Sequence, residues 1–157
     1  MRRNLIFKQR PKNSRWCVSL LWVLLLLFVI RVAGQMLQHW APVSFLPPES
    51  AFQGSHFPYW LLLSIQLLIF VMMTRVAWHA HSGKLEPSAK TTAVLGWLGG
   101  IYMFGSLARL VVGLGFPDSH VWFRTWIPAV SHVVLAGFVL TLYFYHRHFL
   151  YDALGKK

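Results

Sequence analysis

Four stretches of about 20 mostly apolar residues constrain this chain more than any other feature. They cover about 16–36, 58–79, 92–114 and 127–146 of the 157 residues. A helix rises about 1.5 Å per residue, so about 20 residues are needed to cross about 30 Å of hydrocarbon. No stretch alternates with a period of two, which disfavours a β-barrel. The sequence therefore predicts an all-α integral membrane protein with four transmembrane helices.

The composition leaves no room for a soluble domain beside these helices. Charged residues make up 12% of the chain, against roughly 25% in ordinary soluble domains. The connecting segments are short, about 21, 12 and 12 residues, so neighbouring helices should pack antiparallel. We predict a single membrane domain over 1–157, folded as an up-down-up-down four-helix bundle. A soluble enzyme, a disordered tail and, with one cysteine, a disulfide scaffold are excluded.

Positive charge alternates along the connecting segments and predicts the orientation. Residues 1–15 hold six basic residues, and the first loop holds no lysine or arginine. The second loop holds Lys84 and Lys90, the third only Arg124, and the segment after residue 146 holds three basic residues. The positive-inside rule then predicts cytoplasmic termini in a bacterial-type inner (cell) membrane. Residues 1–15 should face anionic lipid rather than nucleic acid.

The first apolar stretch also resembles a secretory signal peptide, because it follows a basic segment. Arg31 comes after its apolar run, however, and no A-x-A cleavage site is visible. We therefore expect this stretch to be retained as a membrane anchor.

Each predicted helix carries a polar side chain displaced from its midpoint toward the outer side. Ionisable residues at membrane depth are costly, and they usually face the bundle interior. No acidic residue lies within any predicted span, so two guanidinium groups there need another partner. The candidate ligand-binding residues are Arg31, Gln35, Gln66, Arg109, Ser131 and His132.

The chemistry of this layer predicts a ligand that carries acceptor oxygens. A planar guanidinium donates hydrogen bonds in pairs, which suits a phosphate head group, a carboxylate or a polarised carbonyl. A phospholipid or a quinone is therefore the expected ligand. The alternative is purely structural: Arg31 and Arg109 reach the outer interface and pair with Glu49 and Asp118. His132 and Gln66 would then only bridge helices, as in a non-catalytic subunit or assembly partner of a larger membrane complex.

Histidine pairs end the second and fourth predicted helices. One imidazole from each pair, His79 and His146, can face the other and ligate haem b, which gives a haem-binding membrane redox protein as an alternative function. Residues i and i+2 point about 200° apart, so both members of one pair cannot enter one coordination shell. His132 with an outer-loop histidine is a second haem alternative. None of these is a firm metal site, and no Walker loop, GxSxG, HExxH or CxxC motif indicates an enzyme or a catalytic residue.

Two further segments have patterns with structural meaning. Residues 37–57 are too apolar for a free loop, so we expect them to lie on the outer membrane surface or to fold over the bundle as a lid. Gly96 and Gly100 form a GxxxG pattern on the third helix, which is typical of close helix approach.

Overall fold

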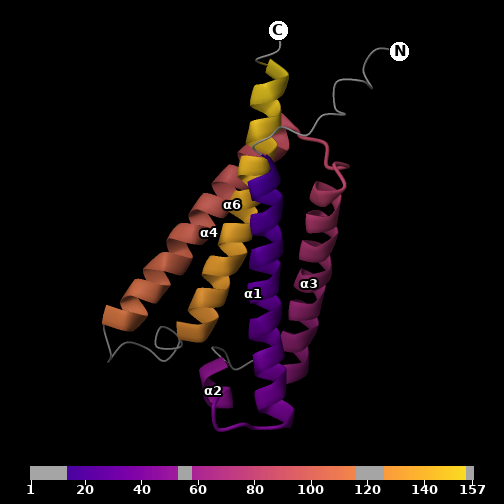
Figure 1. Ribbon diagram of the computed structural model, residues 1–157. Coiled ribbons are helices and arrows are strands. Elements are labelled where there is room, and N and C mark those ends of the chain that lie inside the picture. The colour runs from indigo at the N-terminus through magenta and orange to yellow at the C-terminus, as the bar shows by residue number, and fades with distance from the viewer. Residues whose placement is uncertain (1–13, 53–57, 116–125, 155–157) are drawn as a thin grey trace.

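The structure, a computed structural model, describes residues 14–52, 58–115 and 126–154 (Figure 1). These residues form helices and connections, with no strand among them. The helices are α1 (Ser14–Trp40), α2 (Glu49–Phe52), α3 (Tyr59–His81), α4 (Ala89–Gly115) and α6 (Trp126–Leu154). All except the single-turn α2 are long and apolar enough to cross a membrane. The prediction of an all-helical, multi-pass membrane protein is confirmed.

The ends of α3 follow from its local sequence. Pro58 lies at the N-cap with φ −53°, and its missing N–H costs nothing where no helical partner exists. Ser82 is the C-cap, and Gly83 follows with a positive φ of 67°. A glycine adopts this left-handed conformation without a Cβ clash, so it ends the helix cleanly.

All four long helices extend beyond the predicted spans, and α3 does so by two residues, to His81. α1 continues to Trp40, α4 begins at Ala89, and α6 continues to Leu154. Hydropathy locates only the part of a helix that lies in hydrocarbon, and the helix itself continues wherever its backbone can stay bonded. At the end of α1, the Gln38 side-chain carbonyl accepts a hydrogen bond of 3.1 Å from the Val43 amide as the chain leaves the helix.

The four long helices lie in the spatial order α4, α6, α1, α3. The most extensive contacts join α4 to α6, then α6 to α1, then α1 to α3. Figure 1 shows α1 and α6 in the centre, with α4 and α3 on opposite sides of them. Helices α3 and α4 follow one another in sequence, yet they make little contact. The short helix α2 contacts α1 and α6.

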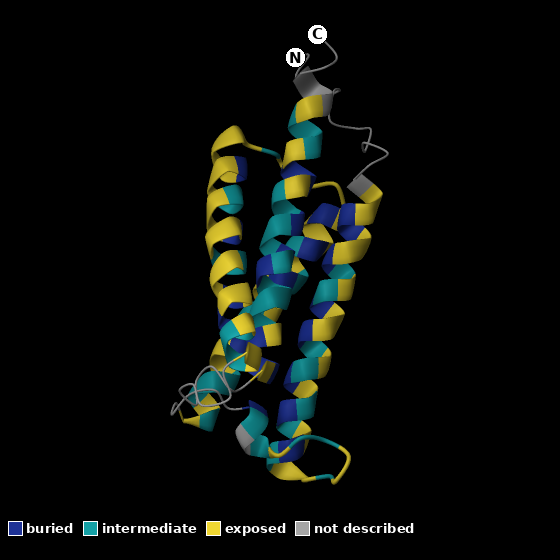
Figure 2. Ribbon diagram, turned by 90° about the vertical axis from the view of Figure 1, so that its left-hand side faces the viewer, coloured by how far each residue is buried: buried dark blue, intermediate teal, exposed yellow. Residues whose placement is uncertain are grey.

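The burial pattern suits an apolar solvent. Large apolar side chains lie outside, such as Phe104 at 77% exposed, while Gln35 and Arg109 are buried. Figure 2 shows exposed residues along the outward sides of the helices and buried residues where helices meet. Helix association in a membrane relies on packing and interhelical hydrogen bonds, because lipid supplies no hydrophobic driving force. The buried polar residues therefore either join the helices or form a functional site.

Candidate functional site

Helix α1 supplies two polar side chains that lie one turn apart on a single face. Nη1 of Arg31 donates to Oε1 of Gln35 at 2.5 Å. Nη2 of Arg31 donates to the backbone carbonyl of Phe52 at 3.1 Å, which ties the short helix α2 to α1. Within the described part of the chain, both partners of Arg31 are neutral groups.

Gln66 extends this arrangement to α3. Its Nε2 donates to the same Oε1 of Gln35, at 3.1 Å. Gln35 is 1% exposed and Gln66 is 6% exposed, so this bond lies inside the protein. We call Arg31, Gln35 and Gln66 the polar network. The structure thus brings together three of the six candidate residues.

The polar network is not internally satisfied. Arg31 Nε, Gln35 Nε2 and Gln66 Oε1 are buried, and none has a hydrogen-bond partner in the described part of the chain. A buried donor or acceptor that makes no hydrogen bond costs about 1–3 kcal/mol. Three such atoms on adjoining side chains mark a place where a bound group would stabilise the protein.

A second polar cluster joins α4 to α6. The Tyr102 hydroxyl and Nδ1 of His132 are 2.5 Å apart. Arg109 is 6% exposed, and its charge acts on both Tyr102 and His132. Arg31 also interacts electrostatically with His132, so the second cluster lies within electrostatic range of the polar network.

Ser131 has a local role. Its hydroxyl donates to the Ile127 carbonyl, four residues earlier on the same helix, at 2.9 Å. This hydroxyl therefore satisfies its own helix backbone, a common arrangement for serine in transmembrane helices. Ser131 is the one candidate residue whose described side-chain hydrogen bond goes only to the backbone of its own helix.

The sequence interpretation missed Tyr102 and the Phe52 carbonyl. Tyr102, Ser106 and Arg109 recur at intervals of four and three residues, which places them on one face of α4. That spacing could have predicted from the sequence that Tyr102 lies on the same helix face as Arg109. The carbonyl of Phe52 had no signal, because every residue has one and only the fold decides which carbonyl meets an arginine.

An apolar groove adjoins the polar network between α1 and α3. Its volume is about 180 Å³, and among the described residues that line it Gln66 alone is polar. We call it the α1–α3 groove. It is lined otherwise by Phe28, Val29, Val32, Ala33, Met36, Leu67 and Phe70.

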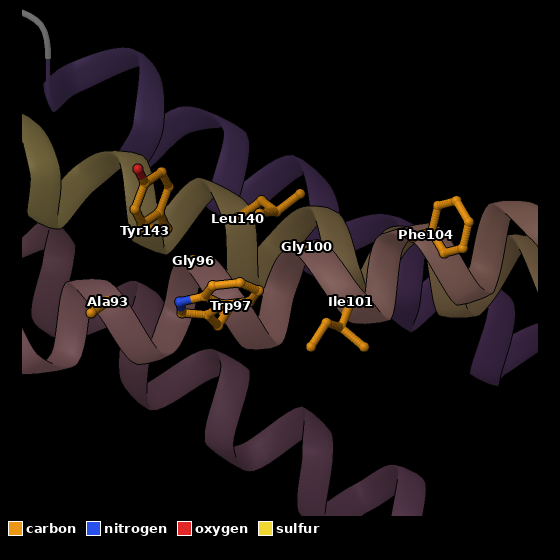
Figure 3. Close-up of a pocket in the computed structure, with 8 residues that line it drawn as sticks. All are labelled: Ala93, Gly96, Trp97, Gly100, Ile101, Phe104, Leu140 and Tyr143. Carbon is orange, nitrogen blue, oxygen red and sulfur yellow. The ribbon is translucent and has the colours of Figure 1, made fainter.

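A larger depression of about 630 Å³ lies between α4 and α6 (Figure 3). It opens where Gly96 and Gly100 lack side chains, and none of the described residues that line it is charged. The sequence predicted close helix approach at Gly96 and Gly100, but the structure has it at Gly96 and Gly99. A Cβ at Gly99 would lie 2.8 Å from Leu140 and one at Gly96 would lie 3.0 Å from Tyr143, whereas one at Gly100 would meet nothing within 4 Å. Close approach to α6 therefore uses Gly96 and Gly99.

The two haem candidates occupy different environments. His79 is exposed on α3, and its Nδ1 lies 2.7 Å from the Arg75 carbonyl. His146 is 3% exposed on α6, and its Nδ1 is buried. Among the described residues, no group of three or more His, Cys, Asp or Glu gathers to hold a metal ion. Haem ligation by these histidines stays a prediction.

The segment after α1 packs back onto it. His39 Nδ1 lies 2.6 Å from a Glu49 carboxylate oxygen, and the His39 ring stacks on Tyr59 with centroids 3.7 Å apart. Phe52 is 5% exposed, and its ring would lie 3.7 Å from a Cβ placed at Gly34. Glu49 is therefore engaged with His39, in contrast to its expected pairing with Arg31. Asp118, the outer-loop His56 and His120, and the rest of the expected lid lie outside the described residues.

Comparisons of the chain with protein-family models, with curated proteins and with solved structures find no match.

Proposed function

We propose that this protein binds an amphiphilic molecule of the membrane, whose apolar part lies in the α1–α3 groove and whose head meets the polar network. The head carries an anionic or carbonyl oxygen, as in a phospholipid or a quinone. The chain acts as a binding protein rather than as an enzyme.

The uncompensated charge of Arg31 carries this proposal. Its guanidinium is half-buried at membrane depth and bonds only two neutral groups within the described residues. A charge in a low-dielectric site is costly unless it is paired, and Arg31 Nε and Gln35 Nε2 remain as unused donors. An anionic or strongly polarised oxygen satisfies both needs at once.

The proposed orientation places this site in the outer half of the membrane. The single domain crosses four times, up-down-up-down, and the excess of basic residues before α1 and after residue 146 favours cytoplasmic termini. Figure 1 supports the arrangement, because α1 begins and α6 ends at the same end, opposite α2. The membrane that fits this charge pattern is a bacterial-type inner membrane.

Co-purification tests the proposal. The full-length protein is extracted in mild detergent, and the lipids and quinones that remain bound are quantified by mass spectrometry. Arg31→Ala should reduce the amount of the retained species at least fivefold, because it removes the charge and one unused donor. Arg75→Ala is the matched control, since Arg75 is also a transmembrane arginine but is exposed on α3. Equal retention by wild type and Arg31→Ala would overturn the proposal.

A further inference from the structure

The hydrogen bonds of the polar network determine which amide atom is oxygen and which is nitrogen. Arginine has donors only, so the Gln35 atom that Arg31 meets must be the acceptor, Oε1. Because Gln66 meets the same oxygen, its contacting atom must be the donor, Nε2. An amide flip of either glutamine would place two donors or two acceptors together. Because Arg31 can only donate, it fixes which amide atoms of Gln35 and Gln66 are left without a hydrogen-bond partner.

The unused atoms are consequently of two kinds. Arg31 Nε and Gln35 Nε2 are donors, and Gln66 Oε1 is an acceptor. Gln66 is also the one polar side chain among the described residues that line the α1–α3 groove, and it is 6% exposed. Since Arg31 and Gln66 both bond one oxygen of Gln35, their polar groups lie within the span of a single lipid head group.

We infer that the site selects amphiphiles whose head carries an O–H or N–H donor beside its acceptor oxygen. The acceptor oxygen meets the donors of Arg31 and Gln35, and the donor meets Oε1 of Gln66. This inference rests on the proposed function and names the ligand class within it. A head that only accepts hydrogen bonds leaves Gln66 Oε1 buried and unpaired, and burying an acceptor without a partner weakens binding.

Two matched ligand pairs test the inference on the purified full-length protein in nanodiscs. The first pair is phosphatidylethanolamine and phosphatidylcholine with identical acyl chains, which share a phosphate and differ in whether the head nitrogen carries N–H. The second pair is a quinol and the corresponding quinone with the same tail, which differ in O–H. Binding is measured by competition for each member, and the two pairs separate a phospholipid source from a quinone source.

The donor-bearing member of the ligand's own pair should bind about five- to tenfold more tightly, as expected for one buried hydrogen bond. Gln66→Leu should bring that ratio close to one, and Ser64→Ala, an exposed serine on the same helix, should leave it unchanged. Arg31→Ala should weaken both members of the pair and keep their ratio.

The outcomes separate the inference from the proposal beneath it. Binding that depends on Arg31 but shows a ratio of one, or a reversed ratio, in both pairs of the wild-type protein overturns the inference and leaves the proposed function standing. If neither pair binds in an Arg31-dependent way, the proposed function falls and the inference falls with it. The wild-type ratios suffice for this decision even where Gln66→Leu does not fold.

Discussion

At the scale of single residues, Gln35 is held in place by hydrogen bonds from side chains on two neighbouring helices, α1 and α3. It is 1% exposed, and its Oε1 accepts hydrogen bonds from both Arg31 and Gln66. This one oxygen therefore links the guanidinium of Arg31 on α1 to the Gln66 side chain on α3. The same guanidinium also donates to the Phe52 carbonyl of α2. No other described side chain joins two helices and the half-buried Arg31 in this way.

Replacing Gln35 tests how much this oxygen stabilises the fold. Gln35→Leu keeps the volume similar but leaves Nη1 of Arg31 and Nε2 of Gln66 without an acceptor. Because hydrogen bonds to charged groups contribute about 1.5–3 kcal/mol, we expect the free energy of unfolding to fall by about 2 kcal/mol. The measurement is reversible unfolding in mixed micelles followed by tryptophan fluorescence.

Ser64→Ala is the control for this substitution. Ser64 is exposed on α3, and its hydroxyl only bonds the Trp60 carbonyl of its own turn, so its loss should change stability by less than about 0.5 kcal/mol. An equally small effect for Gln35→Leu would mean that water or lipid replaces the lost acceptor.

At the scale of elements, the glycines of α4 determine how closely it approaches α6. Gly96 and Gly99 lie against Tyr143 and Leu140, whereas Gly100 lies open in the depression of Figure 3. Small residues at a membrane interface allow close backbone approach, and with it van der Waals packing. Gly99 thus has no free space for a larger side chain, whereas the neighbouring Gly100 has such space.

The pair Gly99→Ala and Gly100→Ala tests this difference with the same chemical change. A methyl group at Gly99 would lie 2.8 Å from Leu140 Cδ2 and 3.2 Å from Val139 Cγ1, so either the Leu140 side chain shifts or the α4–α6 contact loosens. Overpacking of this kind costs about 1–3 kcal/mol. At Gly100 the methyl meets nothing within 4 Å, and the better helix propensity of alanine should leave stability unchanged or slightly higher. Unfolding measurements that rank the two variants equally would contradict the packing.

At the scale of the whole molecule, the first and last transmembrane helices form the central pair. This arrangement places α3 and α4 on opposite sides, with the polar network between α1 and α3 and the Tyr102–His132 cluster between α4 and α6. The two clusters come from different helix pairs, and the α1–α6 contact joins those pairs, with α2 also in contact with both α1 and α6.

Cysteine labelling tests the proposed orientation of the molecule. Cys17 is the only natural cysteine and is fully buried, so it gives little background. Phe45 and Lys84 are exposed in opposite connecting segments. In intact spheroplasts, a membrane-impermeant maleimide should label Phe45→Cys, and it should label Lys84→Cys only after permeabilisation, as the positive-inside rule requires. The reverse pattern would place the polar network on the cytoplasmic side.

The sequence by itself determined the number of membrane helices, because about 20 apolar residues are needed wherever a helix crosses a bilayer. It also determined the two ends of α3, since Pro58 and Gly83 have backbone preferences that act locally. The comparable membrane depth of Arg31, Gln35 and Gln66 could also be predicted from the sequence. The depth of a residue follows from its position along its own helix.

Only the tertiary structure decided which of these polar groups meet. Depth along a helix leaves its rotation and its neighbours open, and both depend on contacts between residues far apart in sequence. The order α4, α6, α1, α3 gives Gln66 a bond to Gln35 and pairs His132 with Tyr102. Rotation likewise made Gly99, and not Gly100, the close contact with α6. Packing of whole helix faces selects these pairings, and no single segment carries that information.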